Sequence, residues 1–342
     1  MRGFPFDPAP DDGEETGVEK SLRPRSLDEF IGQTRVADNL RLAIKAALAR
    51  GEVLDHVLLS GMPGLGKTTL AYLISAAFRV EPTMVSGPNL ERGRDVVGLL
   101  TTLRRGSFLF IDEIHRMSPQ AEEFLYSAME DFTVDVMLDR GPDARSVRLR
   151  LEPFTLVGAT TREGLLTAPL LSRFEIIEKL ECYPTDELDE IVRRSAALLS
   201  CHIDADASRY LAERSRGTPR YANRFLRRVR DVAQTHQGWR EGTALHVDQA
   251  TVKETLERLG VDEHGLDRLD RQIVDLLVAH GEQPVGLKTI AATVGEEERT
   301  IEDCYEPHLI RSGLLRKTPR GRAATSKAFQ LYGRARTLDL FN

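Results

Sequence analysis

The stretch from Gly61 to Thr68, Gly-Met-Pro-Gly-Leu-Gly-Lys-Thr, fits the G-x-x-x-x-G-K-[ST] pattern of a phosphate-binding loop. An apolar run at His56–Leu59 predicts a strand before the loop, and Thr69–Ala77 predicts a helix after it. In that setting the glycines let backbone N–H groups close around phosphate oxygens, and the positive end of the helix faces the anion. A fortuitous glycine-rich turn is the alternative, but a strand, loop and helix in this order predict an α/β fold that binds a nucleoside triphosphate.

Each polar side chain of the loop has a defined task in this chemistry. We expect Lys67 to reach the β- and γ-phosphates and the Thr68 hydroxyl to coordinate Mg²⁺, so ATP and Mg²⁺ are the predicted cofactors. Further contacts with the nucleotide are predicted for Gly64, Gly66 and Thr69.

The composition favours a soluble, cytoplasmic protein of two or three domains. A chain of 342 residues, 41% hydrophobic, exceeds the usual size of one compact domain and has ample material for its cores. No apolar run approaches the roughly 20 residues that span a bilayer, and residues 1–20 lack the hydrophobic segment of a signal peptide, so no membrane partner is expected. The three cysteines, Cys182, Cys201 and Cys304, are too scattered for a disulfide framework or a zinc ribbon.

Charge is unevenly distributed along the chain. The net charge is −6 overall, −4 over residues 1–20 and +7 over residues 311–342. The first twenty residues are rich in acids and proline and lack a periodic apolar pattern, so they predict a disordered acidic arm with no chemistry of its own. The basic C-terminal end is where we expect a polyanion to bind.

Apolar runs that predict strands alternate with helical patterns through the first half of the chain. This alternation predicts a parallel sheet with helices on both faces, in a large domain over residues 21–182. The strand-like runs lie at residues 56–59, 83–85, 107–111 and 154–158. Two further β-type stretches, 133–138 and 146–151, predict a β-hairpin inserted at about residues 132–152, with apolar residues such as Met137 at its tip.

The second half of the chain predicts two smaller domains. Residues 183–255 have wholly helical patterns with one break at Gly217–Arg220, which predicts a small all-helical domain. Over residues 256–342, three helices followed by a basic hairpin at Lys317–Arg322 predict a winged helix. Pro307 lies within the third of these helices, which we expect to kink there or to begin later.

Two adjacent carboxylates follow the predicted buried strand at 107–111. Asp112 and Glu113 are expected at the carboxyl edge of the sheet, beside the phosphate loop, where ligands bind in open α/β sheets. We predict that Asp112 holds Mg²⁺ and that Glu113 polarises the water that attacks the γ-phosphate. An Asp-Glu pair by itself is usually a solvated strand end, but one strand after a phosphate loop it indicates a catalytic pair. His115 is interpreted as a packing or capping residue.

A polar strand end offers a third catalytic element. The predicted strand at 154–158 leads into Gly158–Arg162, which contains two adjacent threonines. A hydroxyl there can hold the attacking water or sense the γ-phosphate, and we predict Thr161 for this role in preference to Thr160. The alternative is a threonine pair that caps the following helix.

Five spaced motifs together resemble the bacterial RuvB family of AAA+ ATPases. The resemblance covers about residues 20–335 and is carried by Leu22–Gln33, Asp112–Arg116, Gly158–Arg162, Gly217–Arg224 and Thr318–Arg322. It implies an α/β AAA+ ATPase domain with a phosphate loop, then a small helical lid domain, then a winged-helix DNA-binding domain. It also implies a homo-hexameric, ATP-driven helicase or translocase that drives branch migration of Holliday junctions in recombination and repair, with RuvA and RuvC as partners.

The resemblance assigns further residues. Arg173 matches the arginine finger, which neutralises charge on the γ-phosphate across a subunit interface, and Arg220 matches the sensor-2 arginine of the lid. A surface salt bridge is the alternative for Arg173. The resemblance also places a further set of residues close to the nucleotide. Each of them, taken singly, would be assigned to core or linker packing: Leu22, Arg23, Ile31, Glu130, Asp131, Phe132 and Tyr183.

The resemblance also points to surfaces for DNA and for a protein partner. Four cations around the basic hairpin, Arg316, Lys317, Arg320 and Arg322, can contact one phosphate backbone without reading sequence. The family often has Arg where this chain has Lys317, which keeps the charge and loses the forked geometry. Winged helices also dock proteins, which is the alternative. The inserted hairpin is expected to bind RuvA, or else to pack on its own domain.

Two functions of different kind are compatible with these features. The first is a motor in which ATP hydrolysis moves the helical lid domains. The lids in turn move the basic winged-helix domains, or heads, which pull duplex DNA. The second is an initiator-like or loader-like AAA+ switch that grips duplex DNA through its winged helix without processive translocation. The sequence contains no aromatic pore loop or recruiting domain of the kind that a protein-remodelling ATPase needs.

Overall fold

The computed structural model describes residues 21–137, 146–238 and 244–333, and its residues form two compact units. The first unit contains Ser21–Glu190 together with Thr218–Arg220, and the second contains Ile191–Gly217 and the chain from Tyr221 onward. The predicted acidic arm at 1–20 and the turn of the predicted hairpin lie outside the described residues.

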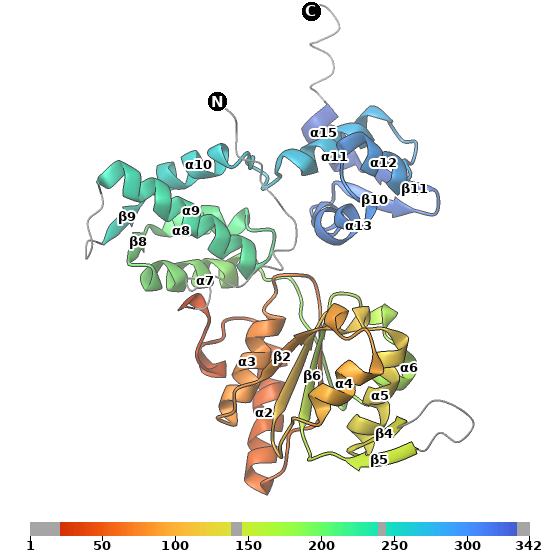
Figure 1. Ribbon diagram of the computed structural model, residues 1–342. Coiled ribbons are helices and arrows are strands. Elements are labelled where there is room, and N and C mark those ends of the chain that lie inside the picture. The colour runs from red at the N-terminus through yellow and green to blue at the C-terminus, as the bar shows by residue number, and fades with distance from the viewer. Residues whose placement is uncertain (1–20, 138–145, 239–243, 334–342) are drawn as a thin grey trace, which may run out of the picture. The chain divides into compact units, whose positions relative to one another are not determined.

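The first unit is built on a five-stranded, fully parallel sheet with the strand order β2-β3-β6-β1-β7 (Figure 1). The strands are β1 (Val57–Ser60), β2 (Thr83–Ser86), β3 (Phe108–Asp112), β6 (Thr155–Thr160) and β7 (Ile176–Lys179). The central strands β1 and β6 are buried along their whole length, as expected for a sheet covered on both faces. Ser60 pairs with Thr160 and Ile111 with Gly158, so β1, β3 and β6 end at one common edge.

Helices cover both faces of this sheet (Figure 1). Side chains alternate between the two faces of a strand. Leu109 and Ile111 of β3 therefore pack on the face covered by α4 and α5. Phe108 lies on the other face, and its ring centroid is 5.2 Å from that of Phe78, the residue that follows α3. The helices are α2 (Thr34–Arg50), α3 (Lys67–Ala77), α4 (Gly93–Leu100), α5 (Pro119–Glu130) and α6 (Ala168–Leu171), with 3₁₀ turns η1 (Leu27–Glu29), η2 (Gly87–Asn89), η3 (Ile114–Arg116) and η4 (Glu163–Leu165).

The predicted inserted hairpin is present and follows α5. Its antiparallel strands are β4 (Thr133–Met137) and β5 (Ser146–Arg150), each within one residue of the predicted end. Val134 is fully buried in the core cluster, and Arg148 donates two hydrogen bonds of 2.9 and 3.0 Å to Asp135 across the strands. The Met137 side chain, predicted at the tip, lies outside the side chains that the structure describes.

The lid segment is helical apart from one short sheet. Its helices are α7 (Thr185–Leu198), α8 (Ala205–Glu213), α9 (Pro219–Gln237) and α10 (Gln249–Arg258). Two strands, β8 (Cys201–Ile203) and β9 (Leu245–Val247), pair in parallel, which corrects the expectation of a wholly helical pattern. Three residues are too few to show a strand periodicity, and their pairing joins segments more than forty residues apart.

The C-terminal segment forms the predicted winged helix. It consists of α11 (Arg268–Ala279), α12 (Leu287–Val294), a third helix in three parts, α13 (Glu298–Thr300), η5 (Ile301–Tyr305) and α14 (Glu306–Arg311), the wing strands β10 (Leu315–Thr318) and β11 (Gly321–Ala324), and α15 (Ser326–Tyr332). The part η5 is a π turn that ends two residues before Pro307. A proline lacks the N–H group that α-helical bonding needs, so the altered winding just before Pro307 is the form that its effect takes here. The third helix still begins at Glu298, close to the predicted start and not later.

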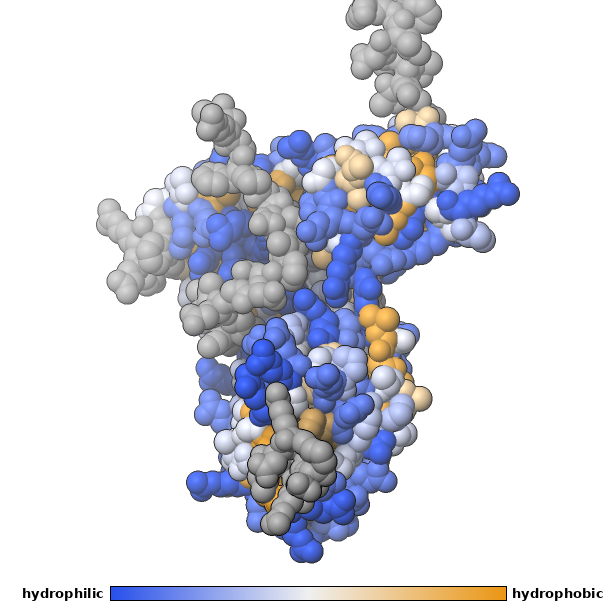
Figure 2. Space-filling model, turned by 45° about the vertical axis from the view of Figure 1, so that its right-hand side comes forward, coloured by the Kyte–Doolittle hydropathy of each residue, from blue (hydrophilic) through white to orange (hydrophobic). Residues whose placement is uncertain are grey.

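Among the described residues, no helix combines the length and the apolar character needed to cross a bilayer. On the face that Figure 2 shows, hydrophilic side chains predominate and apolar ones form small separate groups.

Candidate active site

The phosphate loop joins β1 to α3 and takes a conformation that only glycine allows at three positions. Gly61, Gly64 and Gly66 have φ values of +142°, +80° and +102°. A Cβ atom on Gly61 would lie 2.7 Å from the Leu180 carbonyl oxygen. Gly66 is the N-cap of α3, so the first N–H groups of that helix point into the loop, where an anion can accept from them.

Lys67, the first residue of α3, is 7% exposed and held inside the loop. Its Nζ donates hydrogen bonds to the carbonyl oxygens of Gly61 (2.7 Å) and Met62 (3.0 Å). Burial lowers the pKa of Lys67 to about 8, although the nearby charges of Glu113 and Asp112 oppose this shift. The loop therefore contains a desolvated ammonium group whose charge a bound triphosphate would stabilise.

The two carboxylates lie at the end of β3, as predicted. The Asp112 carboxylate accepts a hydrogen bond of 2.9 Å from the Glu113 backbone N–H. Burial raises the pKa of Asp112, and the adjacent charge of Glu113 raises it further. A divalent cation would reverse this shift. The half-buried carboxylate of Asp112 at the end of β3 and the Thr68 hydroxyl in the first turn of α3 are oxygen ligands of the type that Mg²⁺ prefers.

A hydrogen-bonded group links Glu113 to the end of β6. The Thr161 hydroxyl donates to Glu113 Oε2 at 3.0 Å, and His115 Nδ1 lies 3.3 Å from the same oxygen. His115 Nδ1 also lies 2.9 Å from the hydroxyl of Thr160, which in turn accepts a hydrogen bond from the Arg162 backbone N–H. Thr161 is thus the threonine that contacts Glu113, and Thr160 has the turn-forming role. His115, interpreted as a packing residue, belongs to this group.

Arg220 lies in the first turn of α9 and packs with the first unit. Its backbone N–H donates to the Gly64 carbonyl oxygen at 3.4 Å, and a Cβ atom on Gly64 would come within 2.8 Å of the Arg220 Cβ. The charge of Arg220 acts on both Lys67 and Asp112. A residue 156 positions beyond Gly64 is thereby brought to the phosphate loop.

Arg173 is held by α5 and α6. It donates hydrogen bonds to the carbonyl oxygens of Tyr126 and Pro169 at 3.0 and 2.6 Å, and its Nη2 lies 2.7 Å from Glu130 Oε2. Its guanidinium also lies 5.0 Å from the Tyr126 ring centroid. These contacts bring Arg173 and Glu130 together, and among the described residues they tie Arg173 to α5 and α6 rather than to the phosphate loop.

Of the residues predicted near the base, Tyr183 contacts the phosphate loop directly. The Tyr183 hydroxyl donates to the Leu65 carbonyl oxygen at 3.3 Å, and burial raises the pKa of Tyr183. Leu22 is buried, Ile31 is half-buried, and the Arg23 guanidinium lies 4.7 Å from the ring centroid of Tyr72 on α3.

Other members of that predicted set have different surroundings. Phe132 packs against the rings of His56 and Phe154, which is the packing role that was the alternative. Asp131 is an exposed C-cap residue of α5. Gln33, which sequence reasoning missed, exchanges hydrogen bonds of 2.6 and 3.1 Å with the backbone of Glu181. This exchange joins the N-terminal segment to the segment that contains Tyr183.

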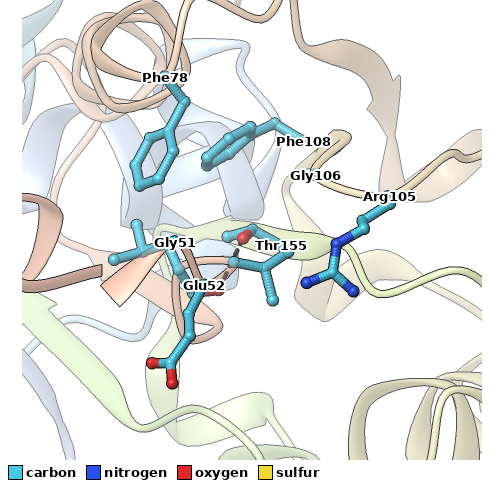
Figure 3. Close-up of a pocket in the computed structure, with 9 residues that line it drawn as sticks. Gly51, Glu52, Phe78, Arg105, Gly106, Phe108 and Thr155 are labelled. Carbon is cyan, nitrogen blue, oxygen red and sulfur yellow. Dashed lines mark hydrogen bonds between the residues drawn. The ribbon is translucent and has the colours of Figure 1, made fainter. Parts of the chain in front are cut away.

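A small pocket at the opposite, amino edge of the sheet contains none of the predicted site residues. Its lining includes Phe78, Arg105, Phe108 and Thr155, and Figure 3 shows the two phenylalanine rings side by side above Thr155. The Thr155 hydroxyl donates to the Leu54 carbonyl oxygen at 2.6 Å. Ligands of open α/β sheets bind at the carboxyl edge, so we assign the chemistry to the phosphate loop and not to this pocket.

The four predicted DNA-binding cations of the wing fall into two pairs. Glu306, which is 1% exposed, binds Lys317 Nζ at 2.7 Å and also contacts Arg322 Nε. Glu302 lies 3.6 and 3.5 Å from the same two cations. Arg316 and Arg320 are exposed, and the described residues include no ion pair with either. Arg322 is therefore a structural partner of a buried carboxylate, whereas Arg316 and Arg320 are exposed to solvent.

Three family models match consecutive parts of the chain. They describe the Holliday junction DNA helicase RuvB P-loop domain at residues 22–180, the RuvB AAA lid domain at 183–262 and the RuvB C-terminal winged helix domain at 263–333. The chain belongs to the RuvB family. The predicted family, the predicted AAA+ fold class and the predicted ATPase character are confirmed by this membership.

Individual RuvB relatives are similar over almost their whole length. The chain is 51% identical to the Holliday junction branch migration complex subunit RuvB of Pelodictyon phaeoclathratiforme over 331 residues, which are 96% of this chain and 94% of the relative. It is 52% identical to the subunit of Chlorobium luteolum over 320 residues, 93% and 91% of the two chains. The solved structure of the Thermotoga maritima RuvB branch migration motor matches with a TM-score of 0.81 at 46% identity, covering 91% and 98%.

In this RuvB-family chain a buried ion-pair cluster connects the lid segment to the winged helix within the second unit. Arg216, 4% exposed and with φ of +54°, places its Nη2 2.7 Å from Asp267 and 2.5 Å from Asp270. Burial raises the pKa of Asp270 to about 7, although the charge of Arg216 opposes this shift. Arg311 donates a hydrogen bond to the Arg216 carbonyl oxygen. The cluster fixes the chain four residues before Arg220.

Proposed function

We propose that this protein is an ATP-driven motor that moves duplex arms through Holliday junctions. The contact between Arg220 and Gly64 is the main support for this proposal. It joins the phosphate loop to α9, the helix that continues into the lid. A change at the γ-phosphate can therefore alter how α9 begins. A motor requires that changes at its nucleotide site move another part of the protein, and here that part is the lid.

The residues at the sheet edge have separate roles in hydrolysis. Lys67 and the N–H groups of the loop bind the phosphates, and Glu113 polarises the attacking water while Thr161 holds its carboxylate. Thr68 and Asp112 hold Mg²⁺, which when bound neutralises phosphate charge. Gly64, Gly66, Thr69, Leu22, Arg23, Ile31 and Tyr183 complete the nucleotide pocket.

Arg173 completes the site of a neighbouring copy in a homo-hexameric ring. The support for this role is that hydrogen bonds hold Arg173 on α5 and α6, together with Glu130, and that its side chain is 23% exposed. An arginine fixed at a subunit surface can neutralise charge on a γ-phosphate across the interface, an effect of about 10³ to 10⁵ in rate. Asp131 and Phe132 would then position α5 at that interface rather than contact nucleotide.

The winged helix is the DNA-binding head. Arg316 and Arg320 contact the phosphate backbone. Lys317 and Arg322 contribute less to DNA binding, because their charges are partly neutralised by Glu306.

The hairpin at about residues 132–152 docks RuvA, and RuvC is a further partner. The proposed domains are the large ATPase domain at 21–182, the lid domain at 183–255 and the winged-helix domain at 256–342. The protein acts in the cytoplasm.

Steady-state ATP hydrolysis with junction DNA separates this motor from an AAA+ switch. A motor keeps turning over while DNA is present, so we expect many ATP molecules hydrolysed per subunit and a rate that junction DNA stimulates. Hydrolysis that stops near one ATP per subunit while DNA remains bound would favour the initiator-like or loader-like switch instead.

A further inference from the structure

Three side chains with metal-binding chemistry meet in the lid segment, and none of them belongs to the proposed nucleotide or DNA sites. His202 lies on β8, His246 on β9, and Asp204 directly before α8. Their candidate ligand atoms all lie within 4.8 Å of one another. The group thus combines two imidazoles and one carboxylate from three different elements.

The strand geometry explains why the two histidines share a face. His202 pairs with His246 in the parallel register, and their rings stack with centroids 5.7 Å apart and planes inclined by 24°. Side chains alternate along a strand, so the flanking residues Cys201, Ile203, Leu245 and Val247 are buried while both histidines face solvent. Cys201 therefore lies on the opposite face and is not a ligand.

Asp204 is oriented toward the histidines and not toward the helix that it begins. An aspartate at the N-cap usually accepts a hydrogen bond from the first turn, but Asp204 makes no such bond to α8. Its Oδ1 lies 3.0 Å from His246 Nε2. Zinc bonds of about 2.0–2.2 Å in a tetrahedral site place two ligand atoms roughly 3.3 Å apart, so this pair already has a suitable spacing.

The position of His246 is fixed by a second contact. Gln237, the last residue of α9, donates to the His246 carbonyl oxygen at 2.5 Å and accepts from its backbone N–H at 3.1 Å. The backbone of β9 is thereby anchored, which fixes the position from which the His246 ring reaches Asp204.

We propose that His202, Asp204 and His246 form a binding site for a transition-metal dication, Zn²⁺ above all, with water completing a tetrahedral shell. Imidazole and carboxylate ligands suit Zn²⁺, whereas Mg²⁺ and Ca²⁺ prefer oxygen ligands alone. The bound ion would tie β8, β9 and the start of α8 together and so stabilise the lid segment.

The test is Zn²⁺ binding by the full-length protein without nucleotide, measured by competition with a chromophoric chelator. We expect one Zn²⁺ per chain at this site with micromolar affinity, and a loss of about tenfold or more in each of His202→Gln, Asp204→Asn and His246→Gln. The matched control is His236→Gln, because His236 also lies in the lid, 3.5 Å from the carboxylate of Glu254, but does not belong to the metal-ligand group found among the described residues. This variant should bind Zn²⁺ like the unchanged protein.

Cobalt provides a second readout that does not depend on the chelator. Co²⁺ in a tetrahedral site of nitrogen and oxygen ligands gives a strong visible absorption. We expect this absorption for the unchanged protein and for the control Cys182→Ser, which alters a thiol that is not a proposed ligand. We do not expect it for His202→Gln or His246→Gln. Zinc affinity that is unaltered in both histidine variants, or weaker than about 1 mM in the unchanged protein, would overturn the proposal.

Discussion

The Thr161 hydroxyl donates a hydrogen bond of 3.0 Å to the Glu113 carboxylate and so connects the ends of the neighbouring strands β6 and β3. Glu113 itself has a φ of +48°, a left-handed conformation that a non-glycine residue adopts only where its surroundings enforce it. The carboxylate is therefore held by its backbone and by a neighbour at the edge where the phosphate loop lies.

Thr161→Val should slow hydrolysis without weakening nucleotide binding. Valine has the shape of threonine but no hydroxyl, so Glu113 loses its hydrogen bond and its fixed orientation. We expect kcat to fall by about 10- to 100-fold while KM for ATP stays nearly constant, which steady-state kinetics would measure. Thr161→Ser keeps the hydroxyl and should retain most of the activity. Equal losses in both variants would contradict a role for the hydrogen bond.

ATP binding should take up a proton at alkaline pH. In the free protein the pKa of Lys67 is about 8, because burial disfavours its ammonium form, and the phosphates of bound ATP raise it. ATP affinity should therefore be highest below pH 8 and fall as the pH rises through 8. Calorimetry in two buffers of different ionisation enthalpy measures the uptake, which should be present at pH 9 and small at pH 6.5.

Lys67→Arg is the control for this pH dependence. A guanidinium stays protonated throughout the range, so any proton uptake that remains in this variant comes from ATP itself. Uptake at pH 9 that is identical in the two proteins would show that Lys67 does not titrate on binding.

Arg320 and Arg322 should respond differently to substitution, although both belong to the wing. Arg320→Ala removes an exposed cation, so duplex affinity should fall and the slope of log K against log salt should decrease in magnitude by about 0.9, with no change in stability. Arg322→Ala leaves the buried Glu306 with Lys317 alone, and should lower the free energy of local opening of α14 by about 2 kcal/mol.

Hydrogen exchange of α14 measures that local opening, and binding titrations at several salt concentrations measure the slope. Glu306→Gln combined with Arg322→Ala removes the uncompensated charge and should recover part of the lost protection. Unchanged exchange in Arg322→Ala would mean that the pair with Glu306 does not stabilise the head.

Arg216→Met should destabilise the second unit more than the loss of any surface ion pair. Two buried carboxylates, Asp267 and Asp270, would lose their cation, which costs about 3–5 kcal/mol for a buried pair. The comparison is Arg228→Ala: the side chains of Arg228 and its partner Asp231 are 55% and 41% exposed, so the effect should stay below about 1 kcal/mol. Hydrogen exchange of α11 distinguishes the two, and similar protection in both variants would refute a stabilising role for Arg216.

Local signals predicted most of the architecture. The phosphate loop, four of the five sheet strands and the hairpin ends within one residue all depend on residue types within a few positions of one another, whereas the edge strand β7 was missed. Glycine at a positive φ, an apolar strand and a proline act on the chain wherever they occur, so a sequence shows them directly.

Contacts between distant residues were not predictable in the same way. Arg216 meets Asp270 54 positions later, Glu306 selects two of the four wing cations, and β8 pairs with β9 from a separate segment. His115 joined the group around Glu113 because the end of β6 lies beside it in the sheet. A single sequence contains the side chains for these contacts but not the packing that selects among them.

The most direct test of the motor is ATP-dependent dissociation of a labelled synthetic four-way junction, with and without a RuvA partner. The controls are Lys67→Ala, Arg173→Ala and, as a matched surface arginine, Arg50→Ala, whose only ion pair among the described residues joins it to the exposed Glu52. We expect the RuvA partner to stimulate dissociation, Lys67→Ala and Arg173→Ala to abolish it, and Arg50→Ala to leave it unchanged. Intact ATP hydrolysis and DNA binding without dissociation under any condition would show that the protein is not a motor of this kind.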